Sequence, residues 1–274
     1  MTAPATGLAV SLPRAGALTD ALVAEVGDGP DPEALGRLRH ELARDLAALV
    51  AELPPGERLR LDGYRFGVAR ENPERLGTDD DDFVASPVRC RRAVGLAAVL
   101  RPGVEAVAGG GDPGARPPWW AAWYGGLGPG GRAVVEAEAV TWATQLWTAL
   151  DWGRLGRAEV GGRDDWWDCP GTRALTVRGR RDVRCRVGGR PVLLVVGSGV
   201  PGAGWHETLG FPALVAALAG GDRAVPGRVV GLWPASGQVR ILPVDGAVLA
   251  ESATAVVGAT ATWVDARLER HGRG

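Results

Sequence analysis

Apolar residues recur at helical spacing in several stretches of the chain. The clearest is residues 31–53, where six leucines stand three or four positions apart and charged residues fill the opposite face. Asp31 suits the N-cap position and Pro32 the first helical position, so we expect a helix to begin there. The same pattern predicts four more helices, at residues 86–100, 132–150, 206–219 and 246–270.

Alternating and continuous apolar runs predict the strands. Residues 174–187 alternate between polar and apolar positions, as a strand with one buried face does. Residues 191–197 are almost entirely apolar, which predicts a strand covered on both faces at the centre of a sheet. Three other stretches have strand character: residues 228–234, residues 238–244, and residues 58–68, which read as a strand or as a hairpin around Asp62-Gly63.

The order of these elements predicts the fold class and the domain organisation. The succession αββαββα indicates an α/β protein with one mixed central β-sheet flanked by helices and a helical N-terminal region. We expect residues 1–110 to form a region of helices and strands packed on the core, and residues 132–274 to form the core itself. Residues 111–131, rich in Gly, Pro and Trp, are expected to be a long loop between them.

That loop carries a cluster of tryptophans. Trp119, Trp120 and Trp123 fall within a few residues of one another. Large aromatic side chains bury their area either in a core or at an interface. Besides a role in the core, the cluster is therefore a candidate surface for docking a protein partner.

Charge and composition narrow the classes of function. The 274 residues have a formal net charge of −1, so any attraction to nucleic acid must come from a local patch. The chain has no lysine, and all 31 basic residues are arginines, so a mechanism that uses a lysine is excluded. We see no signal peptide and no apolar stretch of about 20 residues, and we therefore expect a cytoplasmic protein without a membrane partner.

The few cysteines and three short motifs exclude other chemistry. Cys90, Cys169 and Cys185 are far apart and form no CxxC pair, which argues against a zinc site or a disulfide framework. GLGPGG at 126–131 follows no strand, GSG at 197–199 lacks the outer glycines of a nucleophile elbow, and HETLG at 206–210 lacks a second histidine. Dinucleotide binding, serine hydrolysis and zinc proteolysis are thus not supported.

One strand carries an unusual row of charges. If residues 174–187 form one regular strand, four arginines and one aspartate share a face, and these are Arg178, Arg180, Asp182, Arg184 and Arg186. Two interpretations remain open. The face is either solvated, with Asp182 paired to an arginine, or it contacts phosphate groups, which guanidinium binds in bidentate fashion. Arg89, Arg91 and Arg92, near the start of the helix expected at 86–100, are further candidates for nucleic-acid contacts.

From residue 132 onward the chain resembles the RecB-like branch of the PD-(D/E)xK nuclease superfamily. That branch has a helix with an acidic residue, a strand with G-x-x-D, a strand ending in (D/E)-x-K-T-G, and a further helix with an aromatic residue. Here the first helix has Glu136 and Glu138, GRRD supplies Asp182, and LGFPALVAAL resembles the later helix. The resemblance implies a restriction-endonuclease-like core with a site at these positions.

The departures from this pattern concern the catalytic residues. VVGSGVP stands where D-x-K-T-G-x-P is expected, so Val195 replaces a metal-binding acid and Gly197 replaces the lysine. Some relatives in the superfamily also bind an iron–sulfur cluster on four cysteines, which three scattered cysteines cannot supply. What remains is a vestigial site of Glu138, Asp182, Val195 and Gly197, in which Asp182 is the one weak candidate for a metal ligand.

The leading interpretation is therefore a catalytically inactive RecB-like protein without a cofactor. It would act as a nucleic-acid-binding or scaffolding subunit in DNA repair, recombination or defence, with DNA, a helicase or an active nuclease as candidate partners. A first alternative is an active Mg²⁺-dependent DNA nuclease with a rearranged site, in which Asp182 acts with Glu136 or Glu138 and with Asp164 or Asp165. A second alternative is a structural protein-interaction module with no nucleic-acid role.

Overall fold

The fold is taken from a computed structural model of the chain. It describes residues 15–71, 76, 118–151, 154, 159–160, 164–197, 200–220, 224–233 and 236–272. The helix expected at 86–100, and with it Arg89, Arg91 and Arg92, lies outside the described residues. The described part is an α/β protein, as predicted, but it contains two mixed sheets rather than one.

The first sheet has three strands in the order β1-β4-β3. Strand β4 (Leu175–Gly179) is central; β1 (Leu59–Asp62) pairs with it in parallel and β3 (Asp165–Asp168) pairs with it antiparallel. Its buried face is formed by alternate apolar residues such as Leu61, Trp167 and Val177. The opposite face carries polar residues and one exposed tryptophan, Trp166.

The second sheet has five strands in the order β2-β5-β6-β7-β8. Strands β5 (Val183–Val187) and β6 (Arg190–Val196) form a hairpin, and β6 then pairs in parallel with β7 (Arg228–Trp233). Strand β6 is central and buried on both faces, as its apolar sequence predicts. The edge strands are β2 (Glu159–Val160), which pairs with β5, and β8 (Gln238–Pro243), which pairs with β7.

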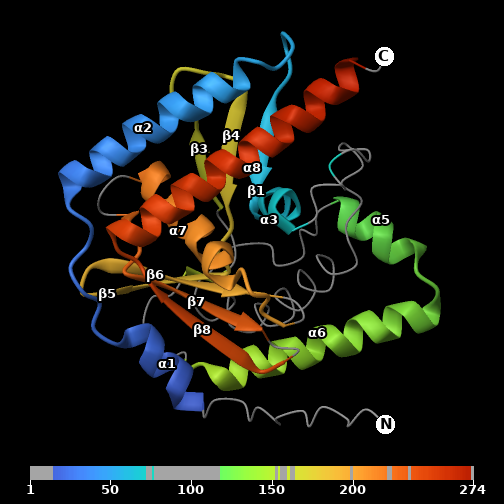
Figure 1. Cartoon of the computed structure of the whole chain (residues 1–274). Helices are drawn as coiled ribbons and strands as arrows, with labels where there is room; N and C mark the ends of the chain where they lie inside the picture. The colour runs from blue at the N-terminus through green and yellow to red at the C-terminus, as the bar shows by residue number, and fades with distance from the viewer. Residues whose placement is uncertain are drawn as a thin grey trace, which may run out of the picture.

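Helix α7 (Trp205–Gly220) lies between the two sheets and connects β6 to β7 (Figure 1). It contacts β3 and β4 on one side and β7 and β8 on the other, which explains why every residue from Leu209 to Leu218 is buried. The approach to β4 is close: a β-carbon on Gly179 would lie 2.7 Å from Cβ of Val215. The helix holds the two sheets together through one continuous core.

Two further helices complete that core. Helix α2 (Pro32–Val50) begins as predicted, because the Asp31 carboxylate accepts hydrogen bonds from the backbone N–H groups of Glu33 and Ala34. It packs on α8 (Gly246–Gly272), which also contacts α7 and α3 (Gly63–Glu71). Figure 1 shows α2 and α8 running side by side across the front of the molecule.

A second, smaller core lies on the other face of the five-stranded sheet. Leu18 and Leu22 of α1 (Ala15–Val23) pack there with even-numbered residues of β6 and β7 and with Val183 and Cys185 of β5. Helix α6 (Pro129–Ala149) packs against α1. Each face of the large sheet is thus covered by helices, which agrees with an α/β architecture.

Two local expectations hold only in part. Residues 58–68 contain a strand, β1, but no hairpin; β1 leads directly into α3, because the Asp62 carboxylate caps the helix by accepting hydrogen bonds from Tyr64 N–H and Arg65 N–H. Part of the expected loop at 111–131 is helical, since α5 (Pro118–Gly126) precedes α6. Arg132 joins these two helices by donating to the carbonyls of Leu127 and Gly125.

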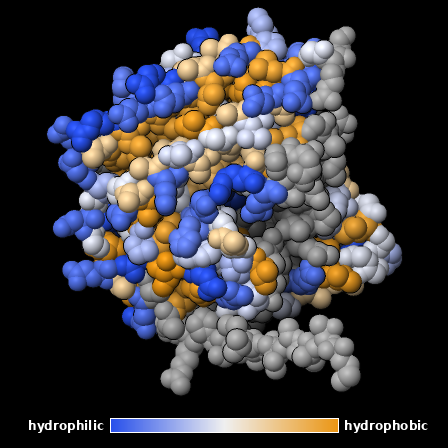
Figure 2. All heavy atoms as spheres, viewed as in Figure 1, coloured by the Kyte–Doolittle hydropathy of each residue, from blue (hydrophilic) through white to orange (hydrophobic). Residues whose placement is uncertain are grey.

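Helix α8 is more apolar over its length than we expected from the sequence. By length and composition it is apolar enough to cross a membrane, with 44% of the relevant segment buried in the structure. Its inner face, including Leu249, Val256 and Trp263, belongs to the main core. On the surface formed by α2 and α8, apolar and polar side chains lie next to one another (Figure 2). Length and composition alone do not distinguish a membrane-spanning helix from a helix of a protein core.

Candidate functional site

Asp182 is a structural residue in the link between the two sheets. It is 2% exposed, and its Oδ2 accepts a hydrogen bond of 2.6 Å from the backbone N–H of Val196. Its own N–H donates to the carbonyl of Leu194 at 2.9 Å, and Arg180 Nε lies 3.5 Å from its Oδ1. The carboxylate therefore ties the β4–β5 link to the end of β6.

An indole ring covers Gly197, the position at which the sequence resemblance would lead one to expect a lysine. A β-carbon on Gly197 would lie 2.6 Å from Cδ1 of Trp233, and one on Gly231 would lie 2.5 Å from Cη2 of the same ring. Trp233 is 6% exposed and belongs to the main core, against which Val195 also packs. The space that a metal and a lysine would need on this face of β6 and β7 is thus filled by a large apolar side chain.

The other carboxylates that the sequence singled out are engaged elsewhere. Asp164 pairs with Arg178 and Asp165 pairs with Arg181. Glu136 accepts a hydrogen bond from the Tyr124 hydroxyl. In the part of the chain that the structure describes, no three Asp, Glu, His or Cys side chains, Glu138 included, are grouped so that they could hold a metal ion.

The predicted arginine face is wrong as a continuous surface. The expected strand 174–187 is broken at residues 180–182, and its halves, β4 and β5, belong to different sheets. Arg178 lies on the face of β4 that points away from α7. Arg184 pairs with Leu193 of the main core, so its side chain and that of Arg186 lie on the α7 side of β5. Because β4 and β5 belong to different sheets, Arg178 does not share a face with Arg184 and Arg186.

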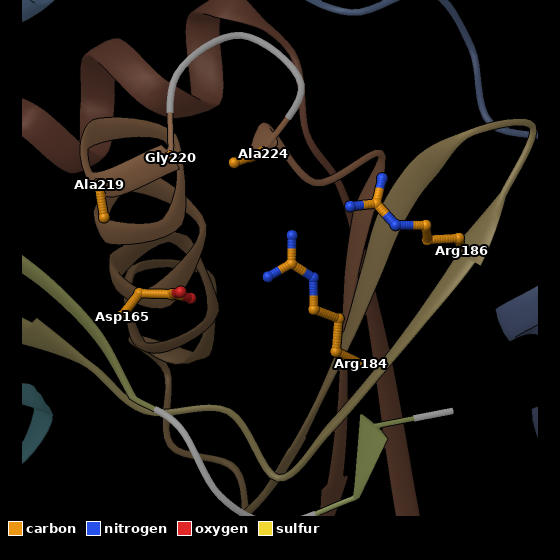
Figure 3. A pocket seen from close by; sticks show the side chains of 6 residues that line it. All are labelled: Asp165, Arg184, Arg186, Ala219, Gly220 and Ala224. Carbon is orange, nitrogen blue, oxygen red and sulfur yellow. The ribbon is translucent and has the colours of Figure 1, made fainter. Parts of the chain in front are cut away.

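Arg184 and Arg186 do line an open cleft at the C-terminal end of α7 (Figure 3). The cleft has a volume of about 250 Å³, and its lining residues are Asp165, Arg184, Arg186, Ala219, Gly220 and Ala224. Figure 3 shows the guanidinium of Arg184 pointing into the cleft between Asp165 of β3 and Arg186. Two of the described lining side chains are thus arginines, and the one carboxylate among them, Asp165, pairs with Arg181. Such a surface suits an oxyanion.

Sequence reasoning missed a second arginine-containing surface. Trp166 is 48% exposed on the outer face of the three-stranded sheet, and the guanidiniums of Arg178 and Arg60 lie 4.9 and 6.0 Å from its ring centroid. The alternation in DWWD, in which Trp167 is buried and Trp166 exposed, is the signal that could have found it.

The tryptophans of the expected docking loop lie on α5. Trp123 is partly buried, and the side chains of Trp119 and Trp120 are outside the described part of the structure. A partner surface here stays a prediction.

The two described cysteines are inert core residues. Burial raises the pKa of the Cys169 thiol to about 11 and also raises the pKa of Cys185. A thiol with a raised pKa is a poor nucleophile and a poor metal ligand at neutral pH.

No protein-family model and no curated protein matches this chain. Its function is therefore inferred from the geometry of its own residues.

Proposed function

We propose that the chain is a catalytically inactive protein with a RecB-like, restriction-endonuclease-like core that acts by binding. Its setting would be DNA repair, recombination or defence, with a helicase or an active nuclease as its protein partner. The element order supports this: α6 precedes Asp182, and β6 leads through α7 to β7 and β8, which is the order that the sequence resemblance implies. The hairpin β5–β6 followed by a parallel crossover is compatible with such a core.

The observation that carries the proposal is the position of Trp233 above Gly197. An active site of this family needs a second carboxylate and a cation near the scissile phosphate. Val195 supplies no ligand, Gly197 supplies no cation, and the indole takes up the adjacent space. The Asp182 carboxylate accepts a hydrogen bond from a backbone N–H and lies next to Arg180. These contacts are those of a structural residue.

The binding role is supported by the cleft beside α7. Arg184 and Arg186 come from alternate positions of β5, on its α7 side, and line an open volume of about 250 Å³. Guanidinium groups bind phosphate with two parallel hydrogen bonds. With a net chain charge of −1, we expect weak autonomous binding that a protein partner strengthens.

A cleavage assay tests the inactive state. Purified protein is incubated with single- and double-stranded DNA in the presence of Mg²⁺ or Mn²⁺, and we expect no cleavage above a metal-free control. Metal-dependent cleavage that Asp182→Ala abolishes would overturn the proposal and favour the active, rearranged site.

A second assay tests the cleft. Affinity for a DNA duplex is measured against salt concentration for the wild type and for the double variant Arg184→Ala/Arg186→Ala. Each lost phosphate contact should lower the salt slope by about 1. Arg37→Ala is the matched control, because Arg37 is an exposed arginine on α2, paired with Glu33. Absent duplex binding, or binding unchanged in the double variant, would rule out the cleft as the nucleic-acid site.

A further inference from the structure

The outer face of the three-stranded sheet presents an exposed aromatic ring beside two arginines. Trp166 lies on β3, an edge strand, and is directly opposite Arg178 on β4. Arg60 reaches the ring from β1, the strand beyond β4. Both guanidiniums therefore belong to strands on the β4 side of β3, and the described part of the structure has no strand beyond β3 to cover the other side of the ring.

The ring is held in place rather than merely exposed. Arg178 donates through Nε to Asp164 and forms an ion pair with the same carboxylate, which fixes its guanidinium 4.9 Å from the centroid of Trp166. A cation near the face of an indole is attracted by its quadrupole. A large aromatic surface that is already oriented loses little conformational entropy on binding a ligand.

The charges of this face favour one phosphate rather than many. Arg178 is neutralised by Asp164, and Asp168 accepts a hydrogen bond from Thr176 Oγ1 at 2.8 Å. Among the described residues no carboxylate forms an ion pair with Arg60. Arg60 is thus the cation of this face that can take up a phosphate while the ring of Trp166 takes up a base.

We propose that this face, defined by Trp166, Arg60 and Arg178, binds single-stranded nucleic acid by stacking a base on Trp166. In a duplex the bases are stacked on one another, whereas an unpaired base offers its π-face to an aromatic platform without regard to sequence. The inference extends the proposed binding function to a second surface, on the side of the small sheet that faces away from α7 and the cleft.

Fluorescence anisotropy with a labelled oligothymidylate of about 12 nucleotides tests this surface, a length that spans one ordinary single-strand site. The assay is run in EDTA so that cleavage cannot interfere. Trp166→Ala should weaken binding by about 5- to 150-fold, the range for loss of one stacked base. Trp166→Phe should retain most of the affinity, and Arg60→Gln should lower it with a smaller salt slope.

Ile241→Ala is the matched control, because Ile241 is an exposed apolar residue on β8, an edge strand of the other sheet. It should bind as the wild type does, and circular dichroism should show the same fold for every variant. No oligothymidylate binding by the wild type overturns the inference, and so does equal binding by Trp166→Ala.

The two proposals fail separately. If oligothymidylate binding is absent while duplex binding still depends on Arg184 and Arg186, this inference fails and the cleft proposal stands. If metal-dependent cleavage is found, the proposal of catalytic inactivity is refuted. The role of Trp166 can still be tested, because its binding assay is run in EDTA.

Discussion

The indole of Trp233 lies over Gly197, so closely that a β-carbon at residue 197 would be 2.6 Å from Cδ1 of the ring. Glycine at this position is what lets the tryptophan fill this face of the sheet, at the end of β6 and β7. The absence of a side chain at residue 197 and the position of the indole are therefore coupled. A side chain at residue 197 and the indole at residue 233 cannot share the space.

The first prediction follows from that contact. Gly197→Ala should lower the free energy of unfolding by about 1–3 kcal/mol, because a buried ring has to shift to admit the methyl group. Chemical denaturation measures the change. Gly202→Ala, whose β-carbon would meet no atom within 4 Å, should be close to neutral. In a Trp233→Ala background the cost of Gly197→Ala should largely disappear; a cost that persists there would refute the coupling.

The second prediction concerns Asp182 as an anchor. Asp182→Ala should lower the free energy of unfolding by about 1–3 kcal/mol, since the buried N–H of Val196 loses its acceptor. Asp182→Asn retains an acceptor oxygen and should cost less. Asp168→Ala removes an exposed aspartate as a control. A melting temperature of the wild type that rises on addition of Mg²⁺ would show instead that a metal binds the folded state.

The third prediction uses the pH dependence of the buried thiols. Burial raises the pKa of Cys169 from 9.0 to about 11, so the unfolded chain releases this proton at lower pH than the folded chain. The contribution is fully present below pH 9.0 and is lost as the pH rises toward 11. Denaturation at a series of pH values should show a decline in this window that is shallower in Cys169→Ala.

Thiol labelling provides an independent check of the same feature. In a Cys90→Ser background only Cys169 and Cys185 remain, and both are buried. At about pH 8 a thiol reagent should label neither in the native protein and both in denaturant. Rapid labelling under native conditions would contradict the burial of these side chains.

The fourth prediction concerns the start of α2. Asp31→Ala should destabilise the protein by about 1 kcal/mol, because the N–H groups of Glu33 and Ala34 lose their side-chain acceptor. Asp45→Ala, in the same helix but exposed and beyond its first turn, is the matched control and should change stability much less. Equal effects of the two variants would contradict a capping role for Asp31.

Local pattern was sufficient for most of the elements around the core. The leucines of α2 and the cap at Asp31 predict that helix, and the continuous apolar run predicts that β6 is central. Pattern failed where one residue type serves two local roles. Asp62-Gly63 is a common turn sequence, yet here the Asp62 carboxylate caps α3. The hydrophobic pattern does not predict this helix.

The prediction that four arginines share one strand face is wrong because the expected strand belongs to two sheets. In residues 175–187 the apolar side chains all stand at odd positions, so the sequence has the pattern of one strand with one buried face. In the structure Leu175 and Val177 are buried in the main core, whereas Val183 and Cys185 are buried in the smaller core beneath α1. A period of two shows only that alternate residues are buried, and carries no information on which core they enter.

What the sequence by itself determined is local: the start and the buried face of α2, and the central position of β6 in its sheet. These follow from spacing and residue type within one element. What only the tertiary structure decided is the placement of β4 and β5 in different sheets, the packing of Trp233 over Gly197, and the meeting of Trp166, Arg178 and Arg60 on an open face. Each of these joins residues that are distant in the chain or belong to different elements, and their proximity is set by the packing of α7 between two sheets.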